Sequence, residues 1–134
     1  MPQQIKNNPR IRAGAVVATT VGLALTAGMA ATPASAASSG WWTSAGNRAE
    51  GYYNSGNGRV YANDLRKDGY SAITQVRTVR DGYFVADVKD TLANGLVSWK
   101  TPTLYSRVNF KMRVCVVKGS QAPTACGAWH QFVK

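Results

Sequence analysis

The sequence has few acidic residues and little of the chemistry that active sites use. Its 134 residues include 6 aspartates and glutamates against 16 lysines and arginines, with one histidine and two cysteines. His130 and Glu50 are the single histidine and the single glutamate, the pair that a small secreted nuclease would need as general acid and base. Glu50 lies in a segment rich in glycine and serine, whereas catalytic groups need rigid placement. No local pattern suggests a Ser-His-Asp triad either, so we expect no enzymatic activity.

Metal ligands are equally scarce. One histidine and two cysteines cannot complete the four ligands of a zinc site. Asn63, Asp64 and Asp68-Gly69 superficially resemble a calcium loop, but they lack its alternating ligands and its distal glutamate. Asparagine and aspartate at these positions are ordinary turn-forming residues. The sequence therefore predicts no metal site and no cofactor.

The first 36 residues have the pattern of an export signal. Three basic residues precede an uncharged run over 13–31, and small residues follow Pro33 and end at Ala36. The alternative is a membrane anchor, but alanine, glycine and threonine make the transfer of this run into lipid weakly favourable. We predict a signal peptide over 1–36 and a secreted, extracellular protein over 37–134.

Cys115 and Cys126 are the two cysteines. In an exported chain such a pair is expected to be oxidised to one disulfide, so neither sulfur is expected to act as a nucleophile. Closing a loop of this length stabilises the fold by about 3 kcal/mol in the chain-entropy model.

No segment of the predicted mature chain has a helical period, and short β-type runs separated by turn residues follow Gly58. The longest run alternates Val108, Phe110, Met112, Val114 and Val116 with polar or basic residues, which is typical of a half-buried strand. Asp81-Gly82 predicts a tight hairpin turn, after which Phe84, Ala86 and Val88 are expected on one face. The expected strands cover 59–63, 70–80, 83–89, 96–101, 104–117 and 126–133. The fold class is all-β, a small antiparallel β-sandwich of six to seven strands, with a small barrel as the alternative.

Residues 37–57 differ in amino-acid composition from the rest of the chain. They are mostly serine, glycine, asparagine and alanine, and they carry two pairs of large aromatic residues. Glycine and serine favour flexibility, while exposed aromatic pairs normally dock on some surface. That surface is either the domain's own sheet or another protein, since tryptophan and tyrosine dominate binding hot spots. We predict a flexible aromatic arm over 37–57, a sandwich domain over 58–134, and partner-binding residues Trp41, Trp42, Arg48, Tyr52 and Tyr53.

The positive charge is spread along the chain. Lys111 and Arg113 share one face of the longest expected strand, and Arg77 lies on a polar face of another. A cationic sheet face fits an anionic cell-wall polymer or an acidic protein, and nucleic acid is the least expected partner of an exported protein. The plain alternative is that the charge only keeps the protein soluble.

The sequence also resembles a group of small secreted β-sandwich proteins of actinobacteria. Three features carry the resemblance: the leader ending in Ala34-Ser35-Ala36, the pattern Val60-Tyr61-Ala62-Asn63-Asp64-Leu65-x-x-Asp68-Gly69-Tyr70, and Arg113-Val114-Cys115 followed by Cys126-Gly127-Ala128-Trp129. Proteins that look like this include the small adaptor of the umbrella toxins. The resemblance implies an adaptor that bridges a lectin-like subunit and a large toxin-bearing subunit, with an N-terminal arm held by the lectin-like partner.

We therefore expect a secreted, non-catalytic binding or adaptor module that links subunits of an extracellular antibacterial toxin assembly. The alternatives are a secreted protease inhibitor that presents loop 118–125, a cationic protein that binds the cell wall or a membrane, and a small nuclease.

Overall fold

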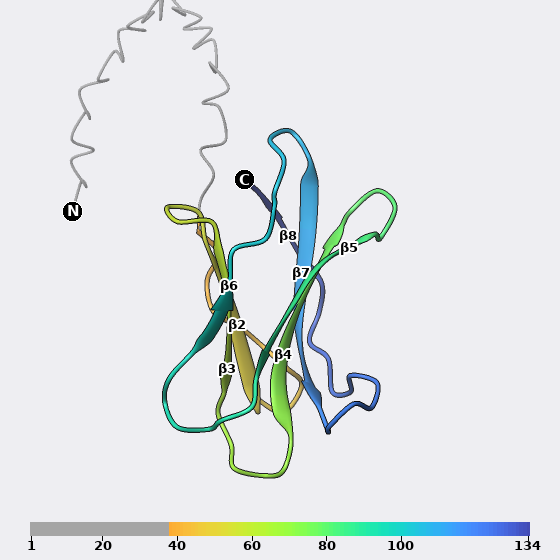
Figure 1. Ribbon diagram of the computed structural model, residues 1–134. Coiled ribbons are helices and arrows are strands. Elements are labelled where there is room, and N and C mark those ends of the chain that lie inside the picture. Colours follow the sequence, from red (N-terminus) through yellow and green to blue (C-terminus); the bar gives the residue numbers. More distant parts are fainter. Residues whose placement is uncertain (1–37) are drawn as a thin grey trace, which may run out of the picture. The chain divides into compact units, whose positions relative to one another are not determined.

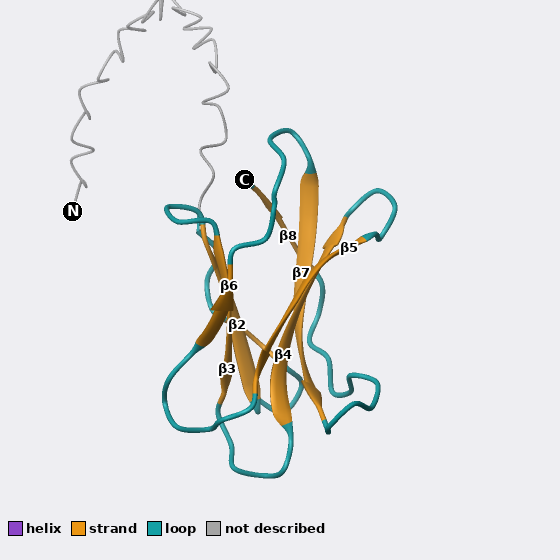
Figure 2. Cartoon of the chain, in the orientation of Figure 1, coloured by secondary structure: helices purple, strands orange, loops and turns teal. Residues whose placement is uncertain are grey.

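Residues 38–134 of the computed structural model form two antiparallel β-sheets of four strands each (Figure 1). No helix occurs in this part of the chain, hence none that could cross a membrane (Figure 2). The all-β prediction is confirmed, with eight strands in place of six or seven. The predicted signal peptide over 1–36 lies outside the described residues.

The two sheets are built from different parts of the chain. Sheet A has the order β1 (Trp42–Thr43), β2 (Ala49–Asn54), β3 (Arg59–Asp64) and β6 (Ser98–Lys100). Sheet B has the order β5 (Phe84–Asp90), β4 (Ser71–Thr78), β7 (Asn109–Val117) and β8 (His130–Val133). The chain crosses from sheet A to sheet B after β3 and returns once for β6, so both sheets contain strands that are distant in sequence.

Alternation along the strands decides which side chains form the core between the sheets. The predicted alternation of β7 is confirmed, because Phe110, Met112 and Val114 are almost fully buried while Lys111 and Arg113 remain partly exposed. The same period of two buries one face of β2 and β3. Most buried apolar side chains of both sheets form one cluster, which includes Ala49, Tyr53, Val60, Ala62, Ala72, Val76, Val88, Phe110, Met112, Val114, Val116 and Phe132. Ile73, Cys115 and Val117 form a second, smaller cluster, against which Cys126 packs.

The prediction of a flexible arm is wrong for residues 38–57. This segment contains β1 and β2, which are integral strands of sheet A. Even the residues before β1 are held, because the Ser39 amide donates to the Tyr53 carbonyl (2.9 Å) and the Tyr53 amide donates to Ser39 Oγ (2.7 Å). Glycine and serine favour flexibility in general, but Gly51 is a core-facing residue of β2, where it allows the strand to pack closely on the opposite sheet. The domain therefore begins well before residue 58.

The predicted position of Phe84 is also wrong. A β-bulge interrupts the register between β4 and β5, so that Val76 pairs with Ala86 but the next residue, Arg77, pairs with Phe84. The extra residue reverses the alternation at this point. Ala86 and Val88 are buried as predicted, whereas Phe84 is 67% exposed and lies beside the Arg77 guanidinium, whose Cζ is 4.8 Å from the ring centroid.

The predicted disulfide between Cys115 and Cys126 is confirmed. It joins β7 to the connection that leads to β8. Next to it, the Gly127 amide donates to the Val114 carbonyl (2.8 Å) and the Ala45 amide donates to the Ala125 carbonyl (2.9 Å). The disulfide therefore fixes a loop that is hydrogen-bonded both to β7 of sheet B and to the turn that follows β1 of sheet A.

Candidate functional site

Four aromatic side chains form a row across the outer face of sheet A. They are Trp41, Tyr52, Tyr61 and Trp99, and we call them the aromatic strip. Tyr52 is paired directly with Tyr61, and Tyr61 with Trp99, while Trp41 immediately precedes β1 and stacks on Tyr52. The ring centroids are 5.2 Å apart for Trp41 and Tyr52 and 5.8 Å apart for Tyr52 and Tyr61. Since directly opposite residues lie about 5 Å apart, the strip spans roughly 15 Å.

The two ends of the strip are the most accessible. Trp41 is 47% exposed and Trp99 is 48% exposed, while Tyr52 and Tyr61 are half-buried between them. Burying the remaining apolar surface of one such tryptophan against a partner would contribute about 2 kcal/mol. The strip is thus a contiguous apolar surface that no other segment among residues 38–134 covers.

Polar residues border the strip on both sides. On one side Asn63 Nδ2 donates to Glu50 Oε1 (2.8 Å), and on the other the Arg59 guanidinium lies 3.6 Å from the Trp99 ring centroid. The Tyr61 hydroxyl accepts from Asn57 Nδ2 (3.2 Å). An aromatic centre with a polar rim is the usual anatomy of a protein interface.

The orientation of the rings favours a protein over a sugar as the partner. A sugar stacks on an open ring face, but Trp41 and Tyr52 face each other at an interplanar angle of 26°. The Arg59 guanidinium covers one face of Trp99. One face of each of these rings is therefore occupied within the strip, which leaves less open ring face for a stacked sugar.

The structure divides the five predicted partner-binding residues into two groups. Trp41 and Tyr52 belong to the aromatic strip. Trp42 points to the other side of sheet A and stacks on His130, with ring centroids 4.3 Å apart. The Arg48 side chain is used within the domain, where its Nη2 lies 2.7 Å from Asp68 Oδ2 and its guanidinium lies over the Tyr70 ring.

Tyr53 cannot contact a partner, because its side chain is fully buried with its ring 4.5 Å from Phe132. Burial raises the pKa of its hydroxyl above the ordinary value of 10.0. The prediction of Tyr53 as a binding residue is therefore wrong, and its physical role is in the core.

Sequence reasoning missed Tyr61 and Trp99 as members of the site. The alternation of β3 places Tyr61 on the polar face, which was a usable signal. Trp99 gave no such signal, since a three-residue strand carries little pattern and its neighbour Tyr61 is 38 positions away in the chain.

The two candidate catalytic residues lie on opposite sides of sheet A. Glu50 is on the outer face beside Asn63, whereas His130 lies against Trp42 on the inner side. They cannot act together on one substrate. Within residues 38–134, no group of three histidine, cysteine, aspartate or glutamate side chains could hold a metal ion.

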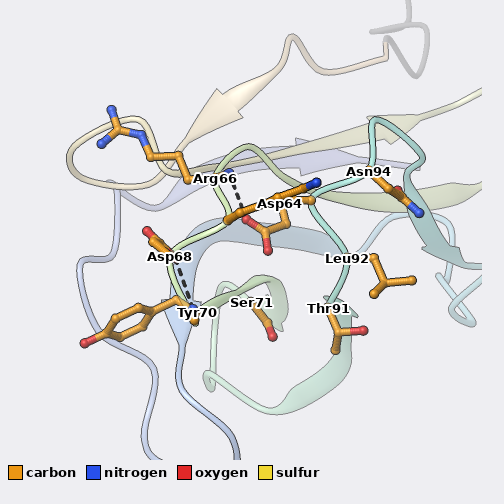
Figure 3. A pocket seen from close by; sticks show the side chains of 11 residues that line it. Asp64, Arg66, Asp68, Tyr70, Ser71, Thr91, Leu92 and Asn94 are labelled. Carbon is orange, nitrogen blue, oxygen red and sulfur yellow. Dashed lines mark hydrogen bonds between the residues drawn. The ribbon is translucent and has the colours of Figure 1, made fainter.

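A hollow of about 560 Å³ lies at the end of the sandwich between loops 65–70 and 91–94 (Figure 3). Its carboxylates are used in forming the turns. Asp64 Oδ1 accepts from the Arg66 amide (3.1 Å), and Asp68 Oδ1 accepts from the Tyr70 amide (3.0 Å). Burial raises the pKa of the Asp64 carboxyl, while the hydrogen bond from Arg48 lowers the pKa of Asp68. Both aspartates therefore cap backbone amides of their own loop, as predicted for turn-forming residues.

The link between Arg48 and Asp68 makes a pH-dependent prediction. The pKa of Asp68 is lowered below its ordinary value of 3.8, so its contribution to stability is present above the unfolded-state pKa and is lost as the pH falls through the folded-state pKa. Asp68→Asn should therefore lower the free energy of unfolding at neutral pH, and the difference from wild type should close below about pH 4. Urea unfolding at a series of pH values measures this difference. The same difference at pH 2 and pH 7, or an undiminished one in an Arg48→Gln background, would contradict the assignment.

Comparison of the chain with protein-family models, with curated proteins and with solved structures found no match.

Proposed function

We propose that this protein is a secreted, non-catalytic binding module that holds a protein partner through the aromatic strip. The single observation that carries the proposal is the row that Trp41, Tyr52, Tyr61 and Trp99 form across sheet A. Aromatic side chains on a rigid sheet lose little conformational entropy when they bind, which is why tryptophan and tyrosine are enriched in interface hot spots. Export is supported by the leader pattern and by the disulfide, a bond that forms in oxidising compartments.

The resemblance to actinobacterial toxin adaptors gives this binding module a concrete role. As an adaptor of an extracellular antibacterial assembly, the protein would hold a lectin-like subunit or the large toxin-bearing subunit. In the adaptors the N-terminal arm makes the contact with the lectin-like partner. Here the corresponding segment contains β1 and β2 of sheet A, so we assign that contact to the aromatic strip instead.

Affinity purification from the native culture medium tests the proposal. The full chain with its own leader carries a tag after Lys134 and is compared with a strip variant, Trp41→Ser with Trp99→Ser. The matched control, Tyr83→Ser with Tyr105→Ser, removes two aromatic residues that are 69% and 66% exposed and lie outside the strip. Thermal unfolding verifies that both variants are folded.

Wild type and control should retain the same secreted proteins at a fixed ratio, identified by mass spectrometry. The strip variant should lose them, since removing two hot-spot tryptophans weakens binding by about 100-fold or more. Recovery of the wild-type protein alone, or equal recovery by the strip variant, would reject the aromatic strip as the binding surface.

A further inference from the structure

The outer faces of the two sheets carry different charge. On the strands of sheet A the outer face has one cation, Arg59, and one anion, Glu50. On sheet B the outer positions hold four cations and one anion, namely Arg77, Lys89, Lys111, Arg113 and Asp87. Charge that serves only solubility is expected to be spread over the whole surface, not concentrated on one sheet face. We propose that the outer face of sheet B binds a linear phosphodiester polymer, a ligand separate from the protein partner of the aromatic strip.

The centre of this cationic face is a preorganised cluster. The Arg113 guanidinium lies 4.6 Å from the Trp129 ring centroid, and Lys111 Nζ lies 5.1 Å from it. Arg113 Nε also donates to Gln75 Oε1 (3.0 Å), and Gln75 is only 6% exposed. The Gln75 amide and the Trp129 ring hold Arg113 in place before any ligand arrives, and the ring also attracts Lys111, which lowers the entropic cost of binding.

The charges of this cluster are available to a ligand. Arg77 of the same face is paired with Asp87 (2.8 Å). In contrast, no carboxylate of the described residues lies within 4.0 Å of the charged groups of Lys111 or Arg113. These two like charges are two positions apart on the same face of β7, where they repel each other. An anion lying across both relieves that repulsion.

The side chains of this face favour the phosphate groups of an extended polymer as the ligand. A guanidinium presents a planar fork that suits a phosphate group, and an ammonium adds a point charge. Arg113 is paired with Gln75 on β4, and Lys111 is paired with Arg77 on β4 and with Gln131 on β8, so the directly paired neighbours of the two cations are polar or cationic. The exposed Phe84 of this face lies further away on β5, with the Arg77 guanidinium over its ring, so the face lacks the broad apolar surface of a lipid-binding element. Both cations lie against the Trp129 ring, so this ring does not offer the free stacking platform that single-stranded nucleic acid uses. A polyol-phosphate chain without bases, the chemistry of anionic cell-wall polymers, fits best.

Binding to poly(glycerol phosphate) at a series of salt concentrations tests the inference. The test variant is Lys111→Gln with Arg113→Gln. The matched control is Lys67→Gln with Arg66→Gln, which removes the same two charges from an exposed loop at the end of the sandwich. Single-stranded DNA with an equal number of phosphates and vesicles of phosphatidylglycerol are measured alongside.

The wild type and the control should bind the polymer at low salt, and the test variant should bind it at least tenfold more weakly. The slope of log K against log salt should be shallower for the test variant by about 1–2, the number of phosphate contacts removed. No binding of the polymer at low salt, or equal loss in test and control variants, would overturn the proposal. Tighter binding to the DNA or to the vesicles than to the polymer would also overturn it. None of these substitutions alters the aromatic strip, so a negative result for polymer binding would not change the expected result of the partner purification.

Discussion

Replacing Gly51 with alanine is expected to lower the free energy of unfolding by about 2–3 kcal/mol and the melting temperature by roughly 10–20 °C. Gly51 lies in β2 with its α-carbon facing sheet B. A β-carbon there would overlap Thr74 Oγ1 and would lie 2.8 Å from Val114 Cγ2. Thr74 cannot simply rotate away, because its fully buried hydroxyl donates to the Tyr61 carbonyl across the two sheets (2.9 Å). The sheets must therefore separate or the hydrogen bond must break.

Thermal and urea unfolding measure the effect of Gly51→Ala. Gly40→Ala is the control, since a β-carbon at Gly40 meets no atom within 4 Å. In a Thr74→Ala background the cost of Gly51→Ala should fall by at least about 1 kcal/mol, because the main obstacle is gone. An unchanged melting temperature for Gly51→Ala would show that the sheets do not approach closely at this point.

Removing the disulfide is expected to lower the free energy of unfolding by about 3 kcal/mol, which corresponds to a fall of roughly 12–24 °C in melting temperature. The two cysteines are 11 residues apart, and the bond restricts the unfolded chain by closing that loop. Because Cys115 is fully buried, we choose Cys115→Ala with Cys126→Ala, which avoids burying a hydroxyl group.

The oxidised wild type, the reduced wild type and the double alanine variant are compared by thermal unfolding. The reduced protein and the variant should melt at similar temperatures, well below the oxidised protein. Equal melting of the oxidised and reduced forms would mean that the loop is held without the disulfide, by the hydrogen bonds of Ala125 with Ala45 and of Gly127 with Val114.

The two proposed binding surfaces lie on opposite faces of one rigid sandwich. The two sheets pack face to face (Figure 1). The strand registers place the aromatic strip on the outer face of sheet A, and the cationic cluster of Lys111, Arg113 and Trp129 on the outer face of sheet B. Both can be occupied together, since the core separates them. Such a module would hold a protein partner on one side and an anionic polymer on the other, which is the geometry that bridging requires.

The strand positions and the facing of most side chains could be predicted from the sequence. The alternation of Phe110, Met112 and Val114 with Lys111 and Arg113 follows from the period of two, which is a local property of any strand. The turn at Asp81-Gly82 follows from local backbone preference, and Gly82 has the positive φ of 67° that it requires. The two failures have different causes. The glycine and serine content of 37–57 concealed a strand, and the bulge that turns Phe84 outward depends on the partner strand and not on its own sequence.

The sequence alone was enough to predict the all-β class, the alternation of core and outer faces, and the single disulfide. These follow from composition, from the two-residue period and from the availability of only one partner for each cysteine. The tertiary structure decided which aromatic residues stand together, because Trp41, Tyr52, Tyr61 and Trp99 become neighbours only through the strand order and register of sheet A. It likewise decided that Tyr53 and Trp42 turn away from solvent and that Trp129 lies beside Lys111 and Arg113. Strand order and register depend on contacts between segments distant in the chain, and no local pattern contains them.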